Sequence, residues 1–322
     1  MRYFYLPLLL KLVLIDAFIV GRMKLTEVNN LTKELNLYNH NELLPWKNPT
    51  SKLTHYTASL LPSHKNSRII GGRAVHIQKH PFTAYLALKG SRFFDFRGGA
   101  VIVARNWAIS AAHCLEYIKS DDIKKNKAFV CSNTSYWQKD YKQHQITRKY
   151  IHEKYDADEL DYDIGLLRVN QPFDGKFEKP IKWVGNNYKY IPNTNAYVLG
   201  WGSTDPSDFK VVTQLREAQI KLEDFNKCSK RYEEKNYLLT DRMICAGEEG
   251  KDACVYDSGG PLIQNGALIG IVSWGTDVCA DKHLPGVYSK ISMFSQWLQS
   301  KMGIKSRAMR RMSFNASQLN MS

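Results

Sequence analysis

The sequence predicts an all-β fold that ends in one helix. Three observations support this prediction. Short apolar runs alternate with turns rich in glycine, which is typical of antiparallel sheets closed into barrels or packed as a sandwich. The chain has 322 residues, of which 43% are hydrophobic, and this is enough for one large core. The apolar runs stop near residue 302, and the last of them has helical spacing.

Six short runs are the predicted strands. Each is apolar and is bounded by residues that favour turns. They span residues 82–88, 100–110, 163–169, 196–200, 267–274 and 286–291. A helix follows, because Phe294, Trp297 and Leu298 share one helical face. We expect Ser292 to cap the N-terminus of this helix.

The two ends of the chain lie outside this pattern. Residues 1–21 have a charged start, an apolar middle and a final glycine, as a secretory signal peptide does. Lys11 and Asp16 interrupt the apolar run, so a retained signal anchor is the alternative. Residues 22–68 are polar and contain no cysteine, and we interpret them as a propeptide. Residues 303–322 are predicted to form a basic polar tail.

Composition narrows the classes of function. The formal net charge of +14 favours a polyanion as a partner of the basic surface, whereas no motif indicates specific binding of nucleic acid. Six cysteines in an exported chain favour disulfides, and none form a Cys-x-x-Cys pair, so we expect no metal and no other cofactor. The sequence therefore predicts a secreted glycoprotein, with N-glycan acceptors at Asn30, Asn133, Asn315 and Asn320.

A candidate nucleophile lies in the stretch of residues 252–262. Ser258 follows Asp257 and precedes two glycines. A serine hydroxyl is a poor nucleophile until its backbone is fixed and a base takes its proton, and the glycines permit the tight turn that this requires. An ordinary surface turn is the alternative, because such turns use the same residue types. The rest of the chain must supply the base.

His113 and Asp163 supply the remaining chemistry. His113 follows a predicted buried strand, where a lone histidine would usually be a structural residue. Asp163 lies at the start of another apolar strand, where an unpaired carboxylate would be costly to bury. With Ser258 they give the chain order His, Asp, Ser, which is one of the recognised orders of a catalytic triad.

Seven motifs in this chain resemble those of the trypsin-like serine proteases, which have the chymotrypsin fold. They are Arg-Ile-Ile-Gly-Gly at 68–72, Ala-Ala-His-Cys at 111–114, Asp-Ile-Gly-Leu-Leu at 163–167, Gly-Trp-Gly at 200–202, Asp-Ser-Gly-Gly-Pro at 257–261, Ser-Trp-Gly at 273–275 and Pro-Gly-Val-Tyr at 285–288. The resemblance identifies residues 69–302 as a trypsin-like serine protease domain. It implies two antiparallel six-stranded β-barrels, with the catalytic residues at their junction, and a C-terminal helix.

The resemblance also implies the catalytic roles. Ser258 would attack the peptide carbonyl and form an acyl-enzyme, and His113 would take and later return the proton. Asp163 would hold the imidazole in the required tautomer. The backbone N–H groups of Tyr256 and Ser258 would form the oxyanion hole.

The start of the domain implies an activation switch. Cleavage after Arg68 would free the amino group of Ile69, which in the family pairs with the aspartate before the nucleophile, here Asp257. The chain is therefore predicted to be a zymogen that an activating protease, or the enzyme itself, cleaves. Asp257 is then a switch and not a catalyst.

Asp252 is predicted to select the substrate. In the family this position forms the floor of the primary specificity pocket, and an acidic residue there binds Arg or Lys. Ala253 replaces the serine of digestive trypsins, so a lysine ammonium loses an acceptor and we expect Arg to be preferred over Lys. The other residues implied at the substrate site are Ser273, Trp274, Gly275 and Gly286.

The resemblance implies two disulfides, Cys228 with Cys245 and Cys254 with Cys279. Arg97 stands in the place of the family partner of Cys114, so a bridge between Cys114 and Cys131 is an open alternative.

Tyr256 departs from the family, which has glycine at this position. Either this tyrosine tilts its backbone N–H away from the oxyanion, or the N–H stays in place and the ring projects over the side of the site where the leaving group departs. We favour the second. The sequence thus predicts a secreted endopeptidase that cleaves proteins after Arg, then Lys. Protein inhibitors are possible partners, but the Tyr256 ring would narrow the substrate range and weaken the binding of rigid protein inhibitors. A catalytically weak, protease-like binding protein and a polyanion-binding protein are the alternatives.

Overall fold

The structure is a computed structural model of the chain, and it describes residues 72–90, 93–203, 211–248, 257–276 and 283–304. Every described residue belongs to one compact unit, which lies within His64–Ser322. The predicted signal peptide, the propeptide and the tail from residue 305 lie outside the described residues, so these boundaries stay predictions. Among the residues described, no helix is long and apolar enough to cross a membrane.

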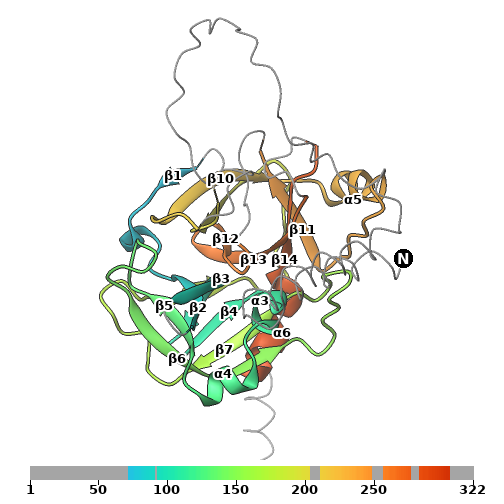
Figure 1. Cartoon of the computed structure of the whole chain (residues 1–322). Coiled ribbons are helices and arrows are strands. Elements are labelled where there is room, and N and C mark those ends of the chain that lie inside the picture. The colour runs from blue at the N-terminus through green and yellow to red at the C-terminus, as the bar shows by residue number, and fades with distance from the viewer. Residues whose placement is uncertain (1–71, 91–92, 204–210, 249–256, 277–282, 305–322) are drawn as a thin grey trace, which may run out of the picture. The chain divides into compact units, whose positions relative to one another are not determined.

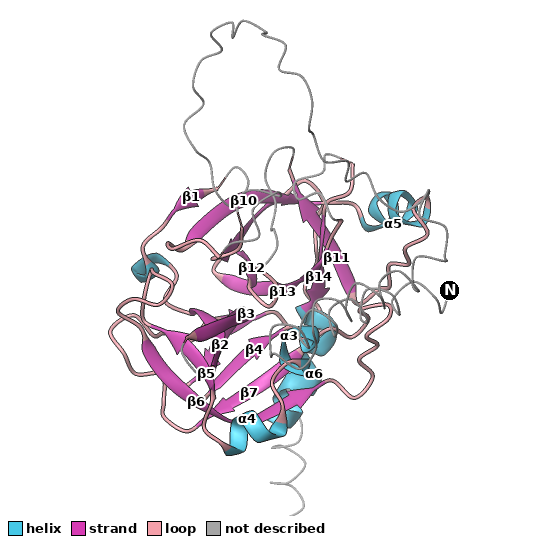
Figure 2. Cartoon of the chain, viewed as in Figure 1, coloured by secondary structure: helices cyan, strands magenta, loops and turns pink. Residues whose placement is uncertain are grey.

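Six strands in the first half of the described chain close into an antiparallel barrel (Figures 1 and 2). Their order around the barrel is β2-β3-β4-β7-β6-β5. The interior is filled by side chains from alternate positions, among them Leu86, Ile102 and Ile109, which are fully buried. The strands are β2 (Thr83–Lys89), β3 (Phe94–Ala104), β4 (Trp107–Ser110), β5 (Ala128–Ser132), β6 (Lys142–Ile151) and β7 (Gly165–Val169).

The second half of the described chain forms a second six-stranded barrel. The order β10-β11-β14-β13-β12-β9 closes because β9 also pairs with β10. Two short strands, β1 (Arg73–Ala74) and β8 (Lys182–Trp183), pair with β10 and β13 outside this ring. The strands of the ring are β9 (Asn195–Gly200), β10 (Arg216–Leu222), β11 (Met243–Gly247), β12 (Pro261–Gln264), β13 (Ala267–Trp274) and β14 (Gly286–Lys290).

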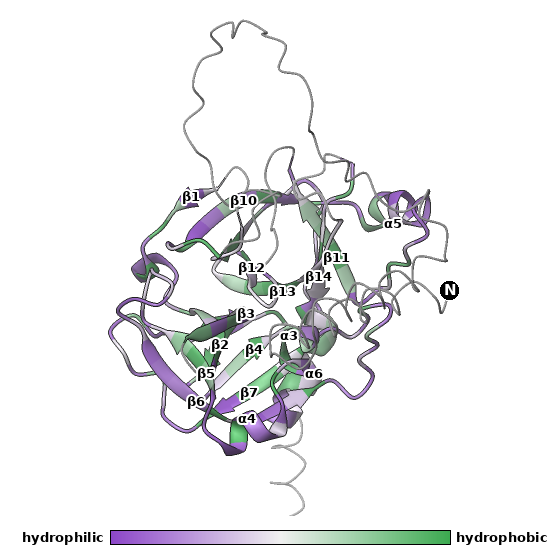
Figure 3. Ribbon diagram, viewed as in Figure 1, coloured by the Kyte–Doolittle hydropathy of each residue, from purple (hydrophilic) through white to green (hydrophobic). Residues whose placement is uncertain are grey.

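The prediction of two six-stranded antiparallel barrels is therefore confirmed. Each of the six predicted strands overlaps an observed strand, but the run at 100–110 forms two strands that turn at Arg105 and Asn106. The polar strand β6 was not predicted, because only alternate residues such as His144 and Ile146 face the core. In Figure 3, β6 is largely purple whereas β4 carries green.

The predicted helix is α6 (Ile291–Lys301), and it buries Phe294 and Leu298 as expected. The expected cap at Ser292 is wrong. The N-cap residue is Lys290, without a side-chain hydrogen bond, and Ser292 lies buried inside the first turn. The remaining elements are short: η1 (Ile77–Lys79), α3 (Ala112–Glu116), α4 (Ser120–Lys124) and α5 (Phe225–Glu233).

Candidate active site

His113 and Asp163 meet as predicted. His113 lies in the short helix α3, which follows directly from the buried strand β4. Its Nδ1 is 2.8 Å from Asp163 Oδ2, and its backbone N–H donates to Asp163 Oδ1 at 2.9 Å. The Asp163 side chain is fully buried, whereas 22% of the His113 side chain is exposed. The carboxylate therefore fixes the imidazole with Nδ1 as the donor and leaves Nε2 facing outward from Asp163.

Two serines of the second barrel also bind Asp163. The hydroxyl of Ser273 on β13 donates to Asp163 Oδ2 at 2.5 Å, and the hydroxyl of Ser289 on β14 donates to the Asp163 carbonyl oxygen at 2.5 Å. A buried carboxylate is tolerated only when its oxygens accept hydrogen bonds in this way. The sequence placed Ser273 at the substrate site and gave no role to Ser289, so sequence reasoning missed both contacts.

The loop of Ser258 packs against the first barrel. The carbonyl oxygen of Ser258 accepts the Gly99 N–H at 2.7 Å, and the Gly259 N–H donates to the Val272 carbonyl at 2.8 Å. Gly259 has a φ of +83°, and a β-carbon there would collide with Ser110 Oγ. A glycine is thus required directly after the candidate nucleophile, for both reasons.

Cys114 contacts both the side chain of the candidate base and the backbone of the candidate nucleophile. Its Sγ is 3.4 Å from His113 Nε2 and 3.5 Å from the Ser258 carbonyl oxygen. Gly98, with a φ of +126°, leaves room for this sulfur, since a β-carbon there would lie 2.7 Å from Sγ. His113 Nε2 and the Ser258 carbonyl oxygen therefore contact the same sulfur atom, and within the described chain no hydrogen bond joins Ser258 Oγ to His113.

The charge state of His113 follows from these neighbours. Burial opposes the imidazolium, but the Cys114 sulfur and the hydrogen bond to Asp163 outweigh it, so the pKa of His113 is raised above its ordinary value of 6.5. The imidazole is correspondingly a stronger base than a free histidine. This direction is expected of a residue that must accept a proton.

Asp257 is buried beside the second barrel. Its Oδ1 accepts the Gly202 N–H at 2.8 Å, and its side chain is inaccessible to solvent. A β-carbon on Gly200 or Gly202 would collide with its carboxylate, which explains the Gly-Trp-Gly motif. The predicted partner, Ile69, lies outside the described residues, as does Arg68, so the activation switch stays a prediction.

The described part of the predicted substrate site lies on β13 and β14. Gly275 and Gly286 face each other, because a β-carbon on Gly275 would be 3.9 Å from Gly286 Cα. Trp274 is partly exposed, and its ring packs edge-on against Tyr232 with a centroid separation of 5.1 Å. Asp252, Ala253 and the oxyanion residue Tyr256 lie outside the described residues.

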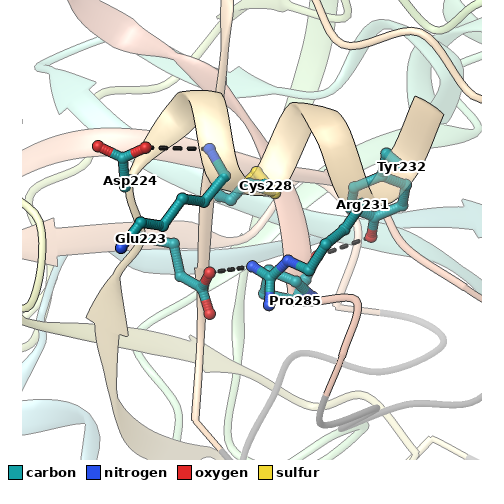
Figure 4. The surroundings of a disulfide bond; sticks show 8 residues. Glu223, Asp224, Cys228, Arg231, Tyr232 and Pro285 are labelled. Carbon is teal, nitrogen blue, oxygen red and sulfur yellow. Dashed lines mark hydrogen bonds and ion pairs between the residues drawn. A yellow bond between two sulfur atoms is a disulfide. The ribbon is translucent and has the colours of Figure 1, made fainter. Parts of the chain in front are cut away.

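A disulfide anchors α5 next to this wall (Figure 4). Cys228 and Cys245 are bonded as predicted, which ties α5 to β11. The hydroxyl of Tyr232 donates to the Pro285 carbonyl at 2.7 Å, directly before Gly286. Asp224 caps α5 by accepting the Lys227 N–H at 3.0 Å. The helix thus supports the strand that carries the predicted wall glycine.

The other cysteines give a mixed outcome. Cys114 and Cys131 are both free and buried, so the alternative of a bridge between them is wrong. Cys114 lies in α3 and Cys131 in β5. Arg97, which stands in the place of the family partner of Cys114, forms an ion pair with Asp95 at 3.5 Å. The predicted bridge between Cys254 and Cys279 lies outside the described residues.

Two closed barrels with a buried Asp–His pair and a serine loop at their junction define the class of chymotrypsin-like serine proteases. The comparisons with known proteins agree. The family model described as Trypsin matches residues 69–298, and the chain belongs to this family.

The relatives cover most of the chain. Trypsin epsilon of Drosophila erecta is 31% identical over 241 residues, which are 74% of this chain and 89% of the relative. Kallikrein 1-related peptidase b1 of Mus musculus is 33% identical over 248 residues, with 72% and 89% covered. A solved structure of neuropsin, a serine protease expressed in the limbic system of mouse brain, matches with a TM-score of 0.62 and 31% identity, over 72% of this chain and 98% of neuropsin. Membership of this family supports the interpretation of the chain as a peptidase with protein substrates.

Proposed function

We propose that the chain is a secreted serine endopeptidase, made as a zymogen, that hydrolyses peptide bonds after Arg and less efficiently after Lys. The observation that carries the proposal is the buried Asp163, 2.8 Å from His113 Nδ1, beside the Ser258 loop. In the reaction His113 takes the Ser258 proton, Ser258 forms the acyl-enzyme, and His113 returns the proton to the leaving amine. Asp163 stabilises the imidazolium that forms between these steps.

Activation would link the new N-terminus of the protease domain to the Ser258 loop. Asp257 is buried next to Ser258 in the sequence, so a charge that pairs with it can fix the Ser258 loop. We assign this charge to the Ile69 amino group that cleavage after Arg68 frees. Before cleavage the oxyanion donors, the N–H groups of Tyr256 and Ser258, would be out of alignment.

The test is active-site labelling with a fluorophosphonate before and after limited cleavage at Arg68. We expect labelling of the cleaved chain, none of the uncleaved chain, and none of a cleaved Ser258→Ala variant. Cleaved chain that is folded and yet fails to label would contradict the proposal. Hydrolysis of a matched pair of Arg and Lys amide peptides then tests specificity, and equal turnover would exclude the proposed preference for Arg.

Tyr256 separates the endopeptidase from the weak, protease-like binding protein. A Tyr256→Gly variant restores the residue that the family has at this place. If Tyr256 disables the oxyanion hole, the variant gains turnover by about 100-fold, which is the effect of one such donor. If the N–H is already in place, turnover of small amide substrates changes little and larger substrates gain access.

A further inference from the structure

Cys114 places a free thiol against the candidate catalytic base. Its Sγ lies 3.4 Å from His113 Nε2, and the residue is 3% exposed. The only disulfide among the described residues joins Cys228 to Cys245, so this sulfur is not bonded to another. Cys131, the other free cysteine, is buried at β5 and has no contact with His113 among the described interactions. Of the two described free thiols, only Cys114 lies beside the imidazole of His113.

The tautomer of His113 directs its free nitrogen toward the thiol. Nδ1 donates a hydrogen bond to Asp163 Oδ2 at 2.8 Å, so in the neutral imidazole Nε2 carries the lone pair. A carboxylate that holds one nitrogen of a histidine in this way also orients the other nitrogen toward a metal ion in many metal sites. His113 thus has the second contact that a histidine ligand needs.

The spacing of the donors fits one small ion. Bonds from Zn²⁺ to sulfur of about 2.3 Å and to imidazole nitrogen of about 2.0 Å, at a tetrahedral angle, set the two donors roughly 3.5 Å apart. The observed separation of Sγ and Nε2 is 3.4 Å. The Ser258 carbonyl oxygen is 3.5 Å from the same sulfur and offers a further oxygen donor. A sulfur and an imidazole nitrogen thus meet at the spacing that Zn²⁺ requires, with the Ser258 carbonyl oxygen beside the sulfur.

We propose that Cys114 and His113 bind a borderline-soft divalent metal ion of the Zn²⁺ class, and that this ion reversibly blocks the base. On binding, the thiol releases its proton to solvent and the thiolate bonds to the metal. A protonated His113 likewise releases its Nε2 proton to solvent, and the lone pair that this leaves forms the second bond. No described group combines three or more His, Cys, Asp or Glu side chains in a metal-binding arrangement. The site therefore has two side-chain ligands, with the remaining positions left to the Ser258 carbonyl and water.

The ion inhibits and is not a cofactor. While Nε2 holds the metal it cannot accept the Ser258 proton, so turnover stops until the metal leaves. The His113 side chain is 22% exposed, so the imidazole is accessible from solvent. The inhibition rests on the proposed function, whereas binding of the metal does not.

Titration of the full, Arg68-cleaved chain with Cd²⁺ in metal-free buffer tests the binding, read as the ultraviolet charge-transfer band of a Cd²⁺–thiolate bond. We expect the band in the wild type and in Cys131→Ala, and its loss in Cys114→Ala. A band that persists in Cys114→Ala, or no band in the wild type, would overturn the proposal. This readout requires no catalysis, so it holds even if the chain proves not to be a peptidase.

Turnover of an Arg amide with added Zn²⁺ tests the inhibition. The wild type and Cys131→Ala should lose activity by about 100-fold or more, as expected when a general base is blocked, and a chelator should restore it. Cys114→Ala should lose much less at the same Zn²⁺ concentration. Equal inhibition of all three chains would place the inhibitory ion elsewhere.

Alkylation of the wild type provides a measurement without any variant. A thiol-alkylating reagent, followed by peptide mapping, reports Cys114 and Cys131 in the same molecule. Zn²⁺ should protect Cys114 and leave the rate at Cys131 unchanged. Protection of neither thiol, or of both equally, would count against the site even if Cys114→Ala failed to fold.

Discussion

The Ser273 hydroxyl donates to Asp163 Oδ2 at 2.5 Å and holds the same oxygen that His113 Nδ1 contacts. Ser273 comes from β13 of the second barrel, whereas His113 belongs to the first. The orientation of the carboxylate, and through it that of the imidazole, thus depends on a residue that the sequence assigned to substrate binding.

Replacement of this hydroxyl should reduce turnover. A hydrogen bond to a charged group contributes about 1.5–3 kcal/mol, so Ser273→Ala should lower kcat by roughly 10- to 100-fold with little change in KM. Kinetics with an Arg amide substrate would measure both constants. Ser289→Ala is the matched control, because it removes a bond to the Asp163 backbone and not to the carboxylate. An equal loss in both variants would assign the effect to stability.

The acid limit of activity should lie above pH 6.5. The raised pKa of His113 means that the imidazole is protonated, and unable to act as a base, up to a higher pH than a free histidine. Cys114 contributes to this shift, so Cys114→Ala should move the limit toward lower pH. The pH dependence of kcat/KM tests this. An unchanged profile in the variant would show that the sulfur has no electrostatic effect on the base.

Stability should fall in acid because of Glu217. Its side chain is 2% exposed and accepts hydrogen bonds from Lys79, His80 and Arg73. Burial raises the pKa of this carboxyl, but these bonds outweigh it and lower the pKa to about 2. The lowered value stabilises the fold by about 3 kcal/mol above pH 4.5, and this contribution disappears as the pH falls from 4.5 through 2.

Glu217→Gln tests this relation. Its free energy of unfolding at pH 7 should be lower than that of the wild type by about 2–3 kcal/mol, and the difference should vanish near pH 2. Urea unfolding at a series of pH values measures both. Parallel curves for the two chains would indicate that Glu217 keeps an ordinary pKa.

The disulfide of α5 should stabilise the second barrel. Cys228 and Cys245 are separated by 17 residues, and a loop of this size corresponds to about 3 kcal/mol. The double variant Cys228→Ala, Cys245→Ala should therefore unfold at a lower urea concentration. A midpoint equal to that of the wild type would show that the contact of Tyr232 with Pro285 holds α5 by itself.

The sequence predicted the barrels and the triad because these features lie in local patterns. Strands β2, β9 and β13 are continuous apolar runs, and His113, Asp163 and Ser258 each lie in a short motif. Strand β6 escaped prediction because its residues alternate between core and solvent, so its mean composition is polar. The extent of a strand is decided by its neighbours in the sheet, which the local sequence does not contain.

Contacts between distant residues were also beyond sequence reasoning. Ser289 reaches Asp163 across 126 positions of the chain, and its hydroxyl gives no local signal. Likewise, Arg97 in the place of a cysteine indicated that Cys114 lacks its family partner. Only the folded barrel shows that the Cys114 sulfur contacts His113 Nε2. The motif Ala-Ala-His-Cys did place the two residues side by side, and this adjacency was the available signal.

Asp163 makes the interface between the two barrels cooperative: its contacts form together or are lost together. Its carboxylate and carbonyl are held by one residue of the first barrel and two of the second, and it has no contact with solvent. If the barrels separated, Asp163 would lose the hydrogen bonds from Ser273 and Ser289, which are half of its four. Partial opening at this seam is therefore unfavourable, and heat inactivation should coincide with loss of the whole fold. A molecule of this family that unfolds in this way would not persist as a partly folded form with an intact Asp163–His113 pair.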